Sequence, residues 1–426
     1  MKVFKILALL LGALSLHAQT LDYAVYFSRH GVRSVLSTNT SLGNLSSDAW
    51  PEWGVPVGYL TAHGRWLMQM MGGYDREYFT QAGLFSGKGC ADADHLYVWA
   101  DNAQRDIETG RALAYGMFPD CKVPVHTLRA DLKYPLFSPA STPLAPGMQA
   151  MDHTIAAAAL GSRIGDNPRW FVGPYGTDVD LMQSILTPSG SKAPKRTLLA
   201  DVPQPAPPAA PRDHFGELTA LTSQLNTIAE AFYLEYVDGM DKKDIGWGRV
   251  DEATIDRLMA LRAIFLNTVQ RTSYTAKAHA SNILSHILRS MEQAVSGQAV
   301  AGSLGNPGDR ELMMLGHDGD MIPLSTLLDV NWTSEGYAPN ETPPGSAFVF
   351  EVWRDAATSK RTVRLWMLSE TPRKMREGTA VSLTAPPSRT PLFVPGCSTT
   401  AEGFPCDWDA FRRVAEAGIN PAFVSK

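Results

Sequence analysis

The chain has 426 residues, a hydrophobic content of 44% and a formal net charge of −5. A polypeptide of this length exceeds a typical single domain, so we expect two packed regions. The acidic balance argues against a nucleic-acid-binding protein, because no surplus of Lys and Arg is available to neutralise a phosphate backbone.

The first eighteen residues (1–18) are typical of a secretory signal peptide. Lys2 and Lys5 precede an apolar stretch over residues 6–16, and a plausible cleavage point follows Ala18. The stretch is too short to span a bilayer, and no later segment is long and apolar enough. We therefore expect a soluble, exported protein, periplasmic or extracellular, with no membrane anchor, and we expect it to be a monomer.

Three apolar or aromatic runs, residues 21–27, 95–100 and 311–315, are predicted to be buried strands. A polar cluster follows each run. Asp101 and Asn102 are predicted to cap a helix over residues 103–115. Because α/β sheets bind ligands in a crevice at the carboxyl ends of their strands, the three clusters are predicted to share one crevice.

The middle of the chain has a different composition. Residues 203–208 form a proline-rich linker or loop. Residues 215–240, 252–269 and 282–295 then carry apolar side chains at helical spacing. Further on, residues 348–353 and 362–368 are predicted to form a hairpin. The pattern indicates an α/β core interrupted by a helical insertion.

Four cysteines in an exported chain indicate two disulfides. The sequence allows three pairings, of which the sequential one is the simplest. A metal site is a weaker alternative, because there is no Cys-x-x-Cys spacing and no histidine partner. The four are Cys90, Cys121, Cys397 and Cys406.

The residues after the first strand suit a bound phosphate. Arg29 and Arg33 bracket His30, and guanidinium groups match phosphate oxygens in geometry and charge. Arg105, on the first turn of the helix after the second strand, adds a third cation near a helix N-terminus. The neutral imidazole of His30 can attack phosphorus, and we expect burial and the arginines to lower its pKa below the usual value of about 6.5.

The cluster after the third strand supplies two further groups. His317 can donate a hydrogen bond to a phosphate oxygen, and Asp318 is the candidate proton donor to the leaving oxygen. Each residue taken alone has a simpler explanation, since Arg105 could be a surface salt-bridge partner and His317-Asp318 a capped turn. Their common position after predicted strands favours the catalytic interpretation.

These residues resemble the histidine acid phosphatases, in particular the branch of bacterial periplasmic phytases and glucose-1-phosphatases. That family carries Arg-His-Gly-x-Arg-x-Pro near the N-terminus and Gly-His-Asp-x-Asn late in the chain. The similarity extends over nearly the whole mature chain, through residues 48–51, 60–61, 88–90, 119–121, 246–249, 331–333 and 342–345.

The resemblance implies a phosphoglycerate-mutase-like three-layer α/β core with an inserted all-α domain. The expected boundaries are 19–147 and 271–426 for the core and 148–270 for the insertion. It also implies the pairs Cys90–Cys121 and Cys397–Cys406. The site residues implied are the nucleophile His30, the phosphate ligands Arg29, Arg33, Arg105 and His317, and the proton donor Asp318, with no metal or other cofactor.

Three positions depart from the family pattern. Val35 replaces the usual proline, and we expect this to loosen the loop after Arg33. The next residues, Leu36, Ser37 and Thr38, lack the basic side chain with which phytases bind the outer phosphates of phytate. Asp320 replaces an asparagine, and we expect it either to raise the pKa of Asp318 by like-charge proximity or to repel the phosphate.

Substrate specificity is expected to come from the inserted helices. Glu230 and Arg262 fall in segments similar to the family's substrate-facing region, and Lys277 and His279 follow. An exposed helix position is the alternative for Arg262. The sequence thus predicts a secreted acid phosphomonoesterase acting on a small phosphate monoester, phytate or a sugar phosphate. A non-catalytic phosphate-binding homologue is the alternative of another class.

Overall fold

The computed structural model describes residues 19–36, 42–128, 136–137, 147–165, 167–191, 198 and 214–425. The predicted signal peptide, the proline-rich linker and two of the departures from the family pattern, Ser37 and Thr38, lie outside these residues. No described helix is both long enough and apolar enough to cross a lipid bilayer.

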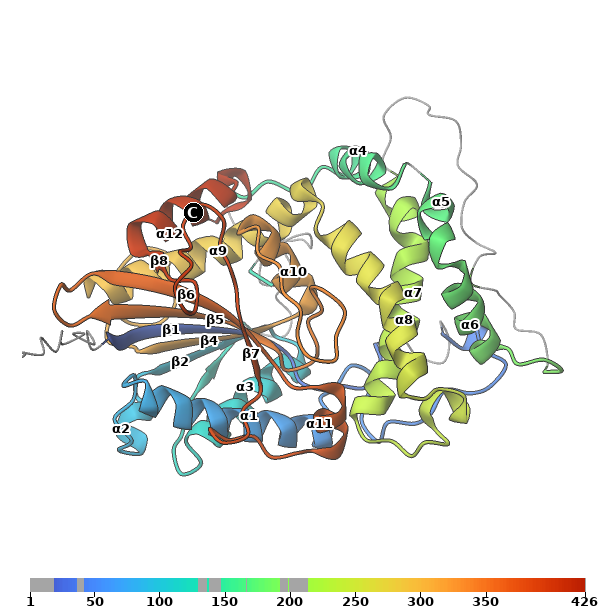
Figure 1. The fold of residues 1–426 in the computed structure, drawn as a ribbon, viewed down its shortest axis with the longest axis horizontal. Helices are drawn as coiled ribbons and strands as arrows, with labels where there is room; N and C mark the ends of the chain where they lie inside the picture. Colours follow the sequence, from blue (N-terminus) through green and yellow to red (C-terminus); the bar gives the residue numbers. More distant parts are fainter. Residues whose placement is uncertain are drawn as a thin grey trace, which may run out of the picture.

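A mixed β-sheet lies at the centre of the fold, with its described strands in the order β3-β2-β4-β1-β5-β6-β7 and β8 paired with β6 (Figure 1). β3, β2, β4 and β1 run parallel to one another, and the remaining neighbours are antiparallel. The strands are β1 (Gln19–Arg29), β2 (Leu96–Ala100), β3 (Val125–His126), β4 (Glu311–Gly316), β5 (Ala347–Asp355), β6 (Arg361–Ser369), β7 (Ser388–Pro391) and β8 (Cys406–Asp407). The five strands predicted from the sequence are therefore present, the last two as a hairpin.

The sheet is covered by helices on both faces, which explains why its central strands are almost continuously apolar. Along β1, Tyr26 packs into one hydrophobic cluster and the next residue, Phe27, into the other. The helices α1 (Ala62–Gln81) and α3 (Gln104–Met117) lie on one face, and α9 (Ser273–Ser296), α10 (Asp318–Leu327) and α12 (Trp408–Gly418) lie on the opposite face (Figure 1). These three layers confirm the predicted α/β fold class.

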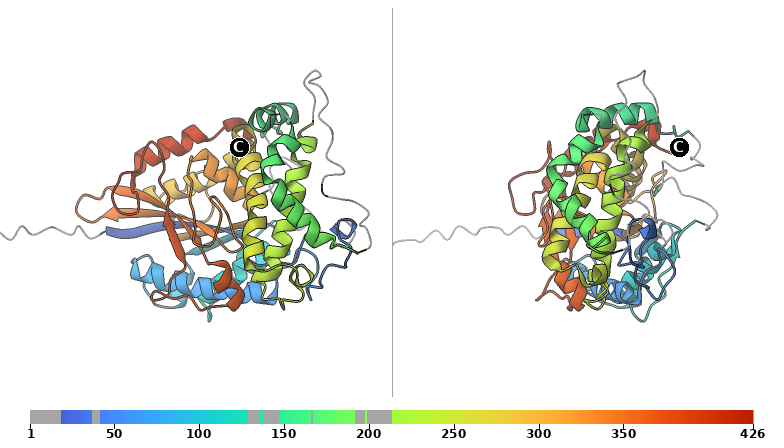
Figure 2. Two further views of the ribbon diagram at one scale, coloured as in Figure 1. Left: turned by 45° about the vertical axis from the view of Figure 1, so that its right-hand side comes forward. Right: turned by 90° about the vertical axis from the view of Figure 1, so that its right-hand side faces the viewer.

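A second group of helices stands beyond the end of the sheet at which β1 finishes (Figure 2). Its longest members, α7 (Phe215–Val237) and α8 (Glu252–Ile264), pack against each other. The other members are α4 (His153–Ile164), α5 (Pro168–Val172) and α6 (Gly176–Leu186). Two short helices connect members of this group, η2 (Gly173–Tyr175) between α5 and α6 and η3 (Ile245–Gly248) between α7 and α8. The short helices elsewhere are α2 (Cys90–Ala93), α11 (Pro372–Glu377), η1 (Leu42–Asn44) and η5 (Pro421–Phe423).

Several predicted helix boundaries are wrong. The run over residues 252–269 is not one α-helix, because α8 ends at Ile264 and a π-helical turn, η4 (Phe265–Gln270), follows. α7 ends at Val237 rather than at residue 240, and α9 begins nine residues before the predicted position 282. The N-cap of α3 is Ala103, and neither Asp101 nor Asn102 caps it, because Asp101 is used in the site described below.

The two disulfides have the sequential pairing. Cys90 is bonded to Cys121 and Cys397 to Cys406, with Cα–Cα separations of 5.4 and 5.0 Å. Both separations lie within the usual range for disulfides. The first links the segment before β2 to the end of α3, and the second closes a short loop at β8.

Candidate active site

The carboxyl ends of β1, β2 and β4 bring the three polar segments together. In the sheet Arg29 is paired with Gly316 and Ala100 with Leu315. The pairing continues past the strands, since the His30 N–H donates to the Gly316 carbonyl at 3.0 Å. Side chains that are up to 289 residues apart in the sequence (29 to 318) therefore meet at one edge of the sheet.

His30 is held as a neutral imidazole with one free ring nitrogen. Its Nδ1 lies 2.9 Å from the carbonyl oxygen of Gly31, so the proton sits on Nδ1 and the lone pair on Nε2. The ring is buried, and this burial, reinforced by the charges of Arg105, Arg29 and Arg33, lowers the pKa of His30 well below its usual value. A histidine in this state is a nucleophile even in acid.

Arg29 and Arg33 share the carboxylate of Glu230. Arg29 Nη2 contacts Glu230 Oε1, and Arg33 Nη2 donates to Oε2 at 2.8 Å. Although burial alone would raise it, the guanidinium groups of Arg33 and Arg29 lower the pKa of Glu230 below its usual range. Both arginines are therefore already paired with a carboxylate, and any anion that binds them competes with Glu230.

Two arginines of the cluster retain unused donors. The buried Nε–H groups of Arg29 and Arg33 have no hydrogen-bond acceptor among the described residues, whereas Arg105 Nε lies 3.6 Å from Asp106 Oδ2. Most buried N–H groups in proteins find an acceptor. These donors, together with the charges, make this end of the sheet a site for an oxyanion.

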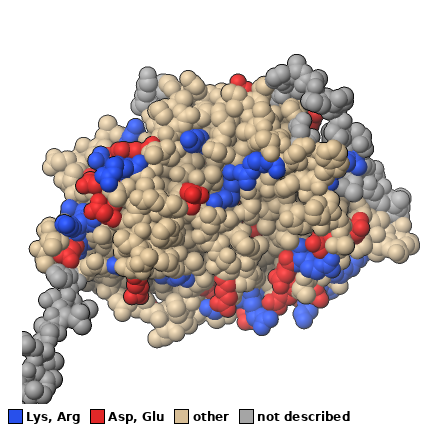
Figure 3. All heavy atoms as spheres, turned by 45° about the horizontal axis from the view of Figure 1, so that its top comes forward, with Lys and Arg blue, Asp and Glu red and all other residues tan. Residues whose placement is uncertain are grey.

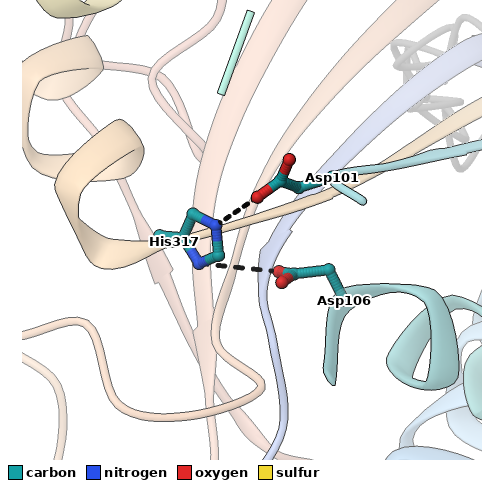
Figure 4. A group of neighbouring side chains, drawn as sticks. All are labelled: Asp101, Asp106 and His317. Carbon is teal, nitrogen blue, oxygen red and sulfur yellow. Dashed lines mark hydrogen bonds and ion pairs between the residues drawn. The ribbon is translucent and has the colours of Figure 1, made fainter. Parts of the chain in front are cut away.

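His317 lies between two carboxylates, as Figure 4 shows. Its Nε2 is 2.7 Å from Asp101 Oδ2, and its Nδ1 is 3.6 Å from Asp106 Oδ1. Burial alone would lower the pKa of His317, but Asp106, Asp101 and Asp320 outweigh it and raise that pKa to about 9. The imidazole is therefore charged in acid and at neutrality, and its ring centroid lies 5.6 Å from that of His30.

The same three side chains have the geometry of a possible cation site. One ligand atom from each of Asp101, Asp106 and His317 lies within 4.8 Å of the others. A protonated imidazole has no lone pair for a metal ion, however, so a proton on His317 and a cation exclude each other. With a pKa of about 9 for His317, the proton is favoured in acid.

Asp318, the first residue of α10, is bound by two guanidinium groups. Arg262 Nη2 donates to Asp318 Oδ2 at 2.7 Å, and Arg29 Nη2 lies 3.4 Å from the same oxygen. Burial alone would raise the pKa of Asp318, but Arg29 and Arg262 outweigh it and hold that pKa well below its usual range. In the substrate-free site Asp318 is therefore ionised.

The expectation that Asp320 raises the pKa of Asp318 is wrong. Asp320 Oδ2 accepts a hydrogen bond from the His317 N–H at 2.9 Å and completes a capping box at the start of α10. Asp320 is buried, and burial raises its own pKa well above its usual value. Its electrostatic partner is His317, whereas the acidity of Asp318 is set by arginines.

The three candidate specificity residues fall in different places. Glu230 lies inside the arginine cluster, and His279 lines a neighbouring pocket, where burial lowers its pKa to about 4. Arg262 is only 1% exposed, so the alternative of an exposed helix position is wrong. Arg262 does not offer free cationic charge either, since its guanidinium binds Asp318, Glu341 and the amide oxygen of Asn226.

The loosening of the loop after Arg33 stays a prediction, since residues 37–41 of that loop lie outside the described residues. The Val35 carbonyl accepts a hydrogen bond from the Gly58 N–H at 3.1 Å, and its side chain packs against the core. Arg33 itself forms a β-bridge with Leu60. Leu36, which follows, is 54% exposed.

Five residues that support the site were not identified as site residues from the sequence. Their roles depend on partners distant in the chain, such as the Gly31 N–H, which donates to Thr109 Oγ1 at 2.9 Å. A weak signal existed for Asp101, which precedes the helix that carries Arg105, and for Asp106, which lies in the first turn of that helix. The five are Asp101, Asp106, Thr109, Asn226 and Glu341.

Comparison with known proteins agrees with this arrangement. The family model described as histidine phosphatase superfamily (branch 2) matches residues 20–367. The chain is 30% identical to phytase AppA of Escherichia coli strain K12 (94% of this chain, 93% of the relative) and 26% identical to a glucose-1-phosphatase of Salmonella typhimurium (92% and 91%). A solved structure of Hafnia alvei phytase with tartrate is 30% identical and superimposes with a TM-score of 0.82 over 96% of this chain and 99% of that one. The chain belongs to branch 2 of the histidine phosphatase superfamily.

Proposed function

We propose that this protein hydrolyses phosphate monoesters through a phosphohistidine intermediate on His30. The observation that carries the proposal is the state of that residue. His30 is buried and neutral, its Nδ1 donates to the Gly31 carbonyl so that Nε2 carries the lone pair, and the charges of Arg105, Arg29 and Arg33 act on the ring. A nucleophile without charge, surrounded by cations that neutralise phosphate oxygens, is what transfer of a phosphoryl group requires.

The reaction then follows in two displacements. Nε2 of His30 attacks phosphorus and the ester P–O bond breaks, while Asp318 gives its proton to the departing oxygen. In the second step Asp318 accepts a proton from water as the water oxygen attacks phosphorus, and the P–N bond breaks. The three arginines and the charged His317 stabilise the phosphate oxygens in both transition states.

The role of Asp318 requires a proton that the substrate-free site does not favour. Arg29 and Arg262 hold this carboxylate ionised when no phosphate is present. A bound phosphate draws Arg29 toward its own oxygens and adds negative charge near Asp318, and both effects raise the pKa of a carboxyl group. We therefore infer that substrate binding itself favours protonation of the acid.

The proposed reaction does not by itself identify which phosphate monoester is the substrate. Relatives are named phytase and glucose-1-phosphatase, and both names fit a monoester of a polyhydroxylated ring. Phytate and a sugar phosphate are accordingly the two candidates that the names of the relatives suggest. The lack of a basic side chain at Leu36 and the next two positions supports the second.

We also propose export and a two-part organisation. Two disulfides support an oxidising compartment, the periplasm or the exterior, in agreement with the signal-like residues 1–18. The helices α4–α8, which stand beside the sheet, support an inserted domain over residues 148–270 (Figure 2).

On the face drawn in Figure 3, Lys and Arg occur in small groups, several of them beside Asp or Glu.

The test is phosphate release by the purified protein from an aryl phosphate, glucose 1-phosphate and phytate, from mild acid to neutral pH. Turnover that is lost in His30→Ala supports the proposal. Binding of phosphate without turnover of any of the three would instead support a non-catalytic binding protein. The ranking of the three substrates decides between the candidate substrate classes.

A further inference from the structure

A pocket of about 350 Å³ lies beside the candidate active site. His317 and Gly319, which flank Asp318 in the sequence, form one side of it. Gln270 lies at the same side, since a β-carbon placed on Gly319 would be 3.7 Å from Gln270 Nε2. Because both chain neighbours of Asp318 line it, the pocket adjoins the proton donor, whose own side chain is not among the described lining residues.

The walls of this pocket are largely apolar. Three aromatic side chains line it, Phe137, Phe215 and Phe265, together with Val269 and Pro323. Phe137 is buried, whereas Phe215 and Phe265 are half-buried and present part of their surface to the pocket. A volume of this size lies within the range of small-molecule sites and readily accommodates one aromatic ring.

A local irregularity of the chain contributes to this wall. Phe265, Val269 and Gln270 all belong to the π-helical turn η4, which interrupts the regular helix after α8. π-Helical turns are rare and occur frequently at functional sites. The remaining walls include parts of α7, α9 and α10, each of which contacts η4.

The pocket offers one cation, His317, whose two ring nitrogens already face Asp101 and Asp106, and it also carries the carboxyl group of Asp320. Among its described lining residues there is no Lys or Arg. His279 is the titratable group away from the catalytic side, and burial lowers its pKa to about 4, so it is neutral in mild acid. Additional phosphate groups require charged or donor partners when they leave water, whereas an uncharged ring gains from contact with the phenylalanines.

We propose that this pocket binds the leaving group of the substrate and selects phosphate monoesters whose alcohol carries one uncharged aromatic ring. The inference rests on the phosphomonoesterase function proposed above and names its substrate class. The phosphate lies among the arginines, the ester oxygen faces Asp318, and the ring lies between Phe215 and Phe265.

The test compares kcat/KM for 2-phenylethyl phosphate and ethyl phosphate, because their leaving alkoxides have similar basicity and differ by the ring. Burial of a phenyl ring predicts a preference of roughly 10- to 100-fold for the first substrate. Phe215→Ala and, separately, Phe265→Leu should lower that ratio by roughly 5-fold or more, with little change for ethyl phosphate. The matched control is Phe393→Ala, a 45% exposed phenylalanine far along the chain, which should leave the ratio unchanged.

The outcomes separate the two proposals. If both esters are hydrolysed with equal kcat/KM, or if both variants keep the wild-type ratio, the pocket does not select an aromatic leaving group and the inference is overturned. If neither ester is hydrolysed although an aryl phosphate is, the inference is overturned and the phosphomonoesterase function stands. If the aryl phosphate is not hydrolysed either, the phosphomonoesterase function fails and the inference fails with it. Each variant carries its own folding control, because ethyl phosphate measures its basal activity.

Discussion

The acidity of the proton donor should depend on Arg262, a residue that lies outside the sequence motifs. Its Nη2 donates to Asp318 Oδ2 at 2.7 Å, and its side chain is only 1% exposed. Two unit charges whose centres are about 4 Å apart interact by about 4 kcal/mol at an effective dielectric constant of about 20. Adjacent opposite charges typically shift a carboxyl pKa by about 1–3 units, which is about 1.4–4 kcal/mol.

Arg262→Gln removes the charge and keeps a hydrogen-bond donor. We expect the pKa of Asp318 in the enzyme–substrate complex to rise by about 1–3 units, so the descending alkaline limb of the kcat profile should move upward by a similar amount. Arg262→Lys keeps the charge and should move the limb much less. The assay is the pH dependence of kcat for an alkyl phosphate, since its alkoxide depends most on protonation.

Loss of the guanidinium also leaves Glu341 buried without its partner, because Arg262 Nε donates to Glu341 Oε1 at 3.0 Å. Breaking such a pair costs about 3–5 kcal/mol. The double variant Arg262→Gln/Glu341→Gln removes the stranded carboxylate and should recover part of that stability, with the same shift of the limb. A folded Arg262→Gln protein whose alkaline limb coincides with that of the wild type would refute the reasoning.

Four further predictions concern other parts of the molecule. Glu230→Gln should lower the inhibition constant of inorganic phosphate as a competitive inhibitor by about tenfold, because phosphate no longer displaces a carboxylate from Arg29 and Arg33. An unchanged inhibition constant would contradict this competition. Asp318→Asn should lower kcat by about 10²–10⁴-fold for an alkyl phosphate and much less for an aryl phosphate, measured side by side; equal losses would exclude the role of proton donor. The rise of the His317 pKa from 6.5 to about 9 corresponds to about 3 kcal/mol of stability. This contribution is present below pH about 6.5 and is lost as the pH rises through about 9. Because Asp101 binds the charged imidazole, urea unfolding should show that Asp101→Asn is destabilising at pH about 6 and nearly neutral at pH about 10. Replacing Cys90 and Cys121 by serine should lower the free energy of unfolding by about 3.7 kcal/mol, and replacing Cys397 and Cys406 should lower it by about 2.6 kcal/mol. The first loss is larger because the first pair closes the longer loop, with a sequence separation of 31 against 9. The reverse order in denaturant titrations would contradict the loop-length argument.

The chemistry of the strand ends could be predicted because it depends on short local patterns. The strands are marked by apolar runs buried on both faces of the sheet, and the polar residues that follow, such as His30 and His317, meet because parallel strands share a carboxyl edge. The disulfide pairing followed from the spacing of the cysteines together with the family resemblance.

What could not be predicted depends on contacts between distant segments. The pairing of Arg262 with Asp318 joins α8 to α10, and nothing in either helix marks Arg262 as buried. Asp101 has the composition of a helix cap but binds His317 instead, because the tertiary contact with a charged imidazole outweighs the local preference. The π-helical turn η4 interrupts an apolar pattern that continues at helical spacing, so periodicity alone predicts one unbroken helix there.

The most direct test of the central claim is to trap the phosphoenzyme. Rapid mixing with an aryl phosphate, followed by an alkaline quench that preserves phosphohistidine, allows the phosphorylated residue to be located by peptide mass spectrometry. The mechanism predicts a phosphoryl group on Nε2 of His30, its accumulation in Asp318→Asn when dephosphorylation becomes slow, and its absence in His30→Ala. Steady turnover with no phosphohistidine, or a phosphoryl group on another residue, would contradict it.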